Sequence, residues 1–191
     1  MPQVGLKYPI YAPLTETATE ATYAGGAVIG EAIKADISIE LTEGKLYAND
    51  VVSEADKEFK QGKIILNVND LADSVKVDLF GHTQEPAGIT DDPTAKMLVS
   101  NGSDNGKYVG VGFYGKKKLK GAVKWRAIWF TKVLFGEPNE SLETKGESIT
   151  YQTPTTEGLV MLDVTGNWKK EVTVDTEAKA KAWLNGLAGI V

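Results

Sequence analysis

Trp-Arg-Ala-Ile-Trp-Phe-Thr-Lys-Val-Leu-Phe, residues 125–135, is the stretch that decides the fold. Alternate positions from Trp125 onward are aromatic, small or β-branched, and the positions between them are still half apolar. A period of two with this composition predicts a β-strand. A strand that is apolar on both sides lies inside a sandwich, or on a sheet that meets another subunit.

The same alternation predicts strands along most of the chain. After a polar loop, a second strand is expected at residues 147–153, which Pro154 ends because proline removes a ladder donor. Residues 108–115 and 122–135 are expected to form a hairpin around the turn Lys-Lys-Lys-Leu-Lys-Gly. Another hairpin is expected between residues 159–164 and 168–174. The other predicted strands are residues 33–41, 63–69 and 97–100. The chain is therefore predicted to be mainly β.

Composition limits the possible functions. The 191 residues predict one domain, residues 1–191, with no internal repeat or linker. No cysteine is present, so no disulfide scaffold or thiolate site is possible. The net charge of −5 argues against binding of a phosphate backbone, which needs clustered lysine and arginine. We expect no signal peptide and no membrane span.

Two segments are longer or more apolar than a simple connection needs. Residues 1–26 alternate at Val4, Leu6, Tyr8 and Ile10, but three prolines interrupt them. We expect this segment to be an extended N-terminal arm, either an edge strand or frayed terminus or a limb on a neighbouring copy. Residues 42–62 are expected to be the extended tip of a hairpin, and a tip of that length usually binds something.

Two helices are predicted. In residues 70–80, Leu71, Val75 and Leu79 form one apolar stripe, Asn69 or Asp70 begins the helix, and Gly81 ends it. In residues 175–187, Asp175 or Thr176 is the expected N-cap. Its expected apolar face consists of Ala178, Ala182, Trp183 and Leu187.

No catalytic chemistry stands out. The motif Gly110-Val111-Gly112-Phe113-Tyr114-Gly115 fits Gly-x-Gly-x-x-Gly, but a dinucleotide site requires a helix directly after it. We interpret Gly110 and Gly112 as space for a large side chain or a neighbouring backbone. His82 is the only histidine, which disfavours a triad or zinc site, and we expect it at the surface or at a helix cap. We therefore predict no enzyme, no cofactor, and no catalytic, cofactor-binding or metal-binding residue.

Several blocks of the sequence resemble the phi13-type family of phage major tail proteins. The clearest is residues 126–158, which contain the deciding strand and the loop after it. The resemblance extends almost from end to end, because its specificity comes from the order and number of the blocks. The other blocks are residues 4–16, 29–71, 74–82, 108–115 and 175–189.

This resemblance implies a β-sandwich or barrel of the tail-tube type, with a short flanking helix, a long hairpin loop and terminal arms. It implies that the chain associates with itself into hexameric rings, which stack into the tail tube of a virion and let DNA pass without specific binding. The chain would be made in the cytoplasm of a bacterial host and would meet tape-measure, tail-terminator and tail-tip proteins, but no membrane. The alternatives are a monomeric β-sandwich that binds a small ligand or a cell surface, and a hydrolase with an unrecognised carboxylate pair.

Two sets of residues are predicted to carry the function. The polar sides of alternating strands have no place in a dry core, so we expect them at the lumen of the tube; their opposite, apolar sides are expected to supply that core. The lumen set is Lys34, Asp36, Ser38, Glu40 and Asn67, with Thr150 and Gln152 as further members. The interface set, apolar residues in the otherwise acidic hairpin tip, is Leu46, Tyr47, Val51, Val52 and Phe59.

Overall fold

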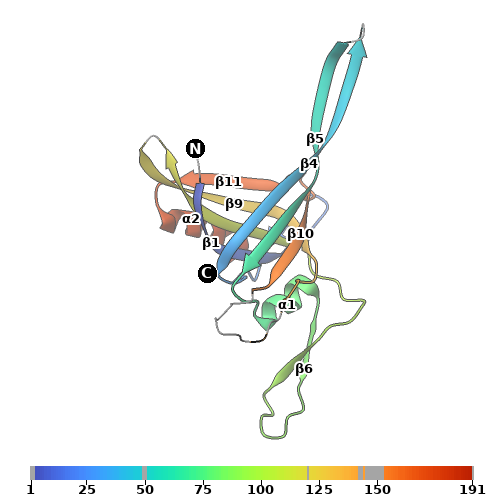
Figure 1. The fold of residues 1–191 in the computed structure, drawn as a ribbon, viewed down its shortest axis with the longest axis vertical. Coiled ribbons are helices and arrows are strands. Elements are labelled where there is room, and N and C mark those ends of the chain that lie inside the picture. The colour runs from blue at the N-terminus through green and yellow to red at the C-terminus, as the bar shows by residue number, and fades with distance from the viewer. Residues whose placement is uncertain (1–2, 49–50, 120, 142–143, 145–152, 191) are drawn as a thin grey trace.

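The fold is mainly β, with a large antiparallel sheet and two helices (Figure 1). It comes from a computed structural model that describes residues 3–48, 51–119, 121–141, 144 and 153–190. The predicted strand at residues 147–153 therefore lies almost wholly outside the described residues. The strands are β1 (Gln3–Glu16), β2 (Ala21–Tyr23), β3 (Ala27–Val28), β4 (Ala32–Ala48), β5 (Val51–Val68), β6 (Thr83–Pro86), β7 (Lys96–Val99), β8 (Val109–Leu119), β9 (Ala122–Phe135), β10 (Thr155–Met161) and β11 (Lys169–Val174); the helices are α1 (Asp73–Phe80) and α2 (Glu177–Ala188).

β9 lies in the middle of the molecule, as its two apolar sides predicted. On one side, Ala127 and Trp129 pack in a cluster with Leu184 of α2. On the other side, Ile128 and Phe130 belong to the main core, which also contains buried residues of β5, β8 and α1. β9 is therefore covered on both faces, which gives the sandwich-like arrangement.

β10 joins the two layers of the sandwich. It pairs with β5 from Thr155 to Val160 and also with the end of β9 from Gly158 to Met161. β11 pairs with the rest of the same edge of β9, from Phe130 to Trp125. The predicted hairpin between these two segments is therefore wrong, because β10 and β11 are successive partners of β9. The loop between them is closed locally by Asp163, which accepts hydrogen bonds from Thr165 and Asn167.

The N-terminal segment differs from the expected arm. β1 pairs with β8 along most of its length, and Ile10, Tyr11 and Ala12 are buried. Two irregularities in the register, with positive φ angles at Gly5 and Tyr8, interrupt this pairing just before Pro9. A local break of this kind lets a proline-containing segment join a sheet, because the proline does not have to donate to a regular ladder.

Both helices cover sheet faces. In α1, Leu71, Val75 and Leu79 are buried, as predicted, and Gly81 ends the helix in the left-handed conformation with φ 82°. Its N-cap is Ala72, however, and not Asn69 or Asp70. α2 begins after Thr176, whose hydroxyl accepts a hydrogen bond from Lys179 N, as predicted.

The face that α2 buries was predicted incorrectly. Its buried residues are Ala180, Leu184 and Ala188, whereas Ala178 and Ala182 are exposed. Trp183 and Leu187 pack at the edge of the same cluster. A stripe of small residues at intervals of four lets the helix lie close to the sheet.

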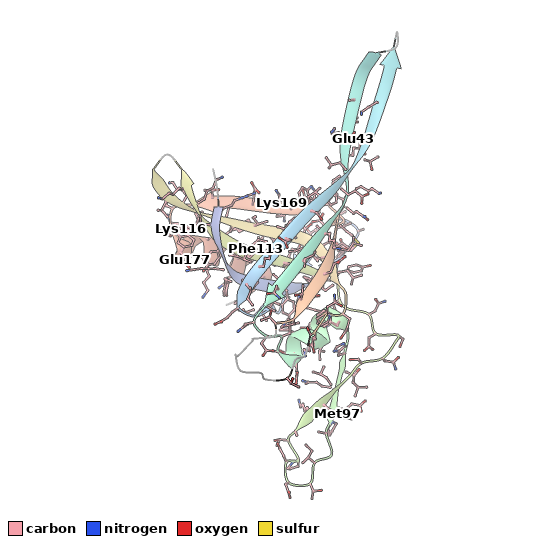
Figure 2. All side chains as sticks on the ribbon, in the orientation of Figure 1. Glu43, Met97, Phe113, Lys116, Lys169 and Glu177 are labelled. Atoms are coloured by element: carbon pink, nitrogen blue, oxygen red, sulfur yellow. The ribbon has the colours of Figure 1, made fainter. Side chains whose placement is uncertain are left out.

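Two hairpins project from opposite ends of the body (Figure 1). β4 and β5 pair continuously as far as Ala48 and Val51, so the predicted long tip is regular strand. The segment after His82 forms a smaller hairpin, β6 and β7, with Met97 exposed on it (Figure 2). β8 and β9 form the predicted hairpin, but strand pairing continues through the lysines to Leu119.

The glycines of the Gly-x-Gly-x-x-Gly motif make room for Trp129, as interpreted from the sequence. A Cβ on Gly110 would lie 2.2 Å from Trp129 Cζ2, and a Cβ on Gly112 would lie 2.6 Å from Trp129 Cε3. Both glycines lie on β8 beside β9, and the motif does not begin a helix.

Candidate functional site

The predicted lumen residues lie together on one polar face. Lys34, Asp36, Ser38 and Glu40 alternate along β4 and are all exposed. Asn67 of β5 is the register partner of Lys34, so it lies beside them. Pairing of β5 with β10 adds Lys63 and Glu157 to this face. We call this set the polar face. Thr150 and Gln152 lie outside the described residues.

The charges of the polar face neutralise one another. Lys34 pairs with Asp36 at 2.5 Å, and Lys63 pairs with Glu157 at 2.5 Å. Glu40 accepts hydrogen bonds from Lys60 and Gln61, and these bonds hold its pKa below the usual value. Three lysines thus face three carboxylates. The sequence suggested a weakly negative surface because it did not show that Lys60, Lys63 and Glu157 lie there.

Asn67 anchors this face to the strand that follows the undescribed segment. Its side-chain amide donates to Pro154 O at 3.1 Å and to Thr155 Oγ1 at 2.8 Å. These bonds hold β5 and β10 in register at the point where β10 begins. Asn67 is half-buried, so its role is partly to fix the sheet.

The predicted interface residues lie at the projecting end of the β4–β5 hairpin. We call residues 42–58 the hairpin arm; Glu43 marks it in Figure 2. The backbones of Leu46, Tyr47, Val51 and Val52 belong to its paired strands, but their side chains lie outside what the structure describes. Phe59, at the base of the arm, stacks on Trp168 of its own chain with ring centroids 4.8 Å apart. Phe59 is therefore engaged within the chain, contrary to the expectation of an exposed interface residue.

The apolar side of β4 is not a dry core, contrary to expectation. Ile33, Ile37 and Ile39 retain 52%, 41% and 37% of their exposure. With Leu6, Phe130 and Trp168, they line an open groove of about 550 Å³ between β4 and the sheet that contains β1 and β9. We call it the apolar groove. β5 buries its matching residues because it lies over the core, whereas β4 is the last strand of the sheet.

The charged residues that line the apolar groove are all basic. They are Lys34, Arg126 and Lys169, the last labelled in Figure 2. Lys34 pairs with Asp36, while Arg126 and Lys169 both contact Glu171, at 2.6 Å and 3.1 Å. Three cations and two carboxylates leave the groove rim with a net charge of +1.

His82 is buried, which contradicts the expected surface or cap position. Its Nε2 lies 2.9 Å from Glu137 Oε2 and 3.3 Å from Ser100 Oγ, and Nδ1 is buried without a hydrogen-bond partner. Its ring lies 5.7 Å from that of Phe80, at the end of α1. The sequence gave no signal for this contact, because Glu137 is 55 residues away in the chain. The arrangement joins α1 to the loop after β9.

Within the described residues, no group of three or more histidine, cysteine, aspartate or glutamate side chains could hold a metal ion. No helix in that part of the chain is long and apolar enough to cross a membrane. No family model matches the sequence, and no curated protein matches it. The arguments about function therefore rest on the polar face, the hairpin arm and the apolar groove.

Proposed function

We propose that this chain is a structural virion protein of the tail-tube type. Copies of it would associate into hexameric rings that stack into the tail tube, the conduit for DNA. The observation that carries the proposal is the state of β4, the last strand of the sheet, whose apolar side is uncovered along the apolar groove. A long, exposed and partly apolar edge strand is an aggregation hazard unless another chain pairs with it or covers it.

Ring formation is a physical answer to such an edge. When a strand of one copy extends the sheet of the next, the contact joins two different surfaces, and a rotation that closes gives a ring. Closure removes every exposed edge, as it does in a barrel. The resemblance of the sequence to phage major tail proteins supports this answer over an open fibre.

The polar face suits the wall of a DNA conduit. Its lysines Lys34, Lys60 and Lys63 are each paired with a carboxylate within 3 Å. Binding of DNA gains much of its free energy from cations that replace the counterions of phosphates, so neutralised lysines gain little. DNA would therefore pass such a wall without being held there.

Electron microscopy of negatively stained protein tests this proposal. Purified chain at increasing concentration is expected to give rings or tubes, with light scattering to follow the growth of assemblies. A variant in which a short Gly-Ser turn replaces residues 48–56 is expected to stay folded and not to form tubes. Single, monodisperse particles of the unmodified chain at every accessible concentration would contradict the proposal.

A second candidate function is a binding module for a small ligand. The apolar groove favours it, because about 550 Å³ falls within the usual size range of ligand sites. The groove is open along one side, however, and few polar groups converge in it, so it offers little to orient a small molecule. Thermal unfolding with apolar fluorescent probes separates the two functions, since a ligand site would bind them in dispersed, unassembled protein.

A further inference from the structure

The apolar groove exposes aliphatic side chains that a stable particle would keep from water. Ile33, Ile37 and Ile39 form a continuous row on the β4 side, and Phe130 and Trp168 form the floor. An exposed apolar row of this kind, with polar residues at its rim, is typical of a surface that a polypeptide covers.

We infer that the apolar groove of one copy receives the end of the hairpin arm of a second copy; this rests on the proposed self-assembly. The arm end brings Leu46, Tyr47, Val51 and Val52, four apolar residues in an otherwise polar stretch. The arm projects away from the body, so its end is available to a neighbour (Figure 1). The inference identifies which surface of the neighbour it meets.

The charges of the two surfaces are complementary. The arm, residues 42–58, contains five acidic residues and two lysines, which gives a net charge of −3. The groove rim has a net charge of +1 from Lys34, Arg126 and Lys169 against Asp36 and Glu171. Opposite net charges favour encounter in this orientation and disfavour contact of one arm with another.

An arm cannot reach the groove of its own chain. The groove residues and the arm end lie on the same strand, with Ile37 in the groove and Tyr47 near the end. Ten residues of strand span about 33 Å, so the two sites are separated along a straight hairpin. The contact therefore joins two different surfaces of two copies. Repetition of it moves successive copies along the hairpin direction by about that distance.

Cysteine cross-linking tests the contact, because the chain has no cysteine of its own. Copies with Tyr47→Cys, enlarged by a size tag, are mixed with untagged copies with Ile37→Cys and oxidised. The matched control replaces Ile37→Cys by Leu159→Cys, since Leu159 is 40% exposed and Ile37 is 41% exposed. Leu159 belongs to β10, where its register partner is Lys63 of the polar face.

The mixed dimer with Ile37→Cys is expected to exceed the Leu159→Cys control at least fivefold on a non-reducing gel. Equal yields, or a larger yield with Leu159→Cys, would overturn the inference. A second variant, Ile37→Asp, is expected to raise the concentration needed for assembly about tenfold, whereas Leu159→Asp is not. Thermal unfolding of each variant confirms that it is folded.

The failures of the inference and of the proposed function are distinguishable. If tubes of the unmodified chain form but Tyr47→Cys does not join Ile37→Cys, the inference is wrong and the proposed function stands. If the cross-link forms but no rings or tubes appear, the contact is real and the tail-tube function is wrong. If neither appears, both are wrong.

Discussion

β9 and β4 belong to the same sheet and alternate in the same way, yet their surroundings are opposite. Trp129 and Phe130, neighbours on β9, are both buried, because α2 covers one face and the main core covers the other. On β4, both the polar residues and the isoleucines beside them are exposed. Alternation therefore predicts a strand, but the elements that cover it decide which of its faces become core.

The largest expected difference between the two strands is in large-to-small substitution. Trp129→Ala is expected to lower the free energy of unfolding by about 3–5 kcal/mol, because it empties a packed site between β8 and α2. Ile37→Ala on β4 is expected to cost about 1 kcal/mol, because Ile37 is only partly buried. Chemical denaturation of both variants measures the difference, and similar losses would mean that β4 is as well covered as β9.

A smaller expected difference concerns glycine. Gly110→Ala places a methyl group 2.2 Å from Trp129 and 2.6 Å from Tyr23, so we expect a loss of about 1–3 kcal/mol. Gly44→Ala on β4 meets no atom within 4 Å, and removing a glycine from a strand is expected to stabilise the protein by about 0.5 kcal/mol. Opposite signs in the two unfolding curves are the expected result. A loss at Gly44 would show that something packs against the arm.

The two regions are expected to respond to opposite ends of the pH scale. Burial, and then the hydrogen bond to Glu177, raise the pKa of Tyr114 on β8 to about 12. The folded state therefore favours the neutral phenol, and this contribution is complete below pH about 10, the ordinary pKa, and is lost as pH rises through about 12. Lys60 and then Gln61 lower the pKa of Glu40 beside β4, so its contribution is lost as pH falls through that lowered pKa.

Thermal unfolding as a function of pH checks this prediction. Tyr114→Phe is expected to lose less stability between pH 10 and 12 than the unmodified chain. Glu40→Gln is expected to reduce the loss at acid pH only slightly, because the group is exposed to solvent. An unchanged alkaline curve for Tyr114→Phe would contradict the first part.

The smallest expected effect on stability is charge reversal on the polar face. Replacing Asp36 and Glu40 by lysine breaks only exposed ion pairs, so we expect a change within about 0.5 kcal/mol for each. Rings are expected to form as before, while the new cations bind DNA, more strongly at low salt. Electron microscopy and DNA binding at two salt concentrations measure these effects. Loss of ring assembly would indicate that the two residues lie at a contact between copies.

Local patterns predicted the local elements well. The period of two in residues 125–135 predicted β9, and the stripe of Leu71, Val75 and Leu79 predicted the buried side of α1. The glycine Gly81 predicted where α1 ends. These signals depend on neighbours within a few residues, which the sequence contains in full.

Features that depend on distant partners could not be predicted in the same way. The prolines in β1 suggested an arm, but register breaks opposite β8 admit the segment to the sheet. Residues after Met161 resembled half of a hairpin, because the sequence did not show that β9 is long enough to pair with both β10 and β11. The exposed side of β4 followed from its position as the last strand, which only the pairing order reveals.

The double pairing of β10 also decides how the molecule carries mechanical load. A pull along the hairpin arm acts along β5, whose six register pairs with β10 would be strained together in shear. From β10 the load passes to β9 through a further four pairs and reaches the most tightly packed strand of the body. The projecting arm is thus tied to the centre of the protein through hydrogen-bonded strands, so tension applied at its end spreads through the ladder instead of peeling a single strand away.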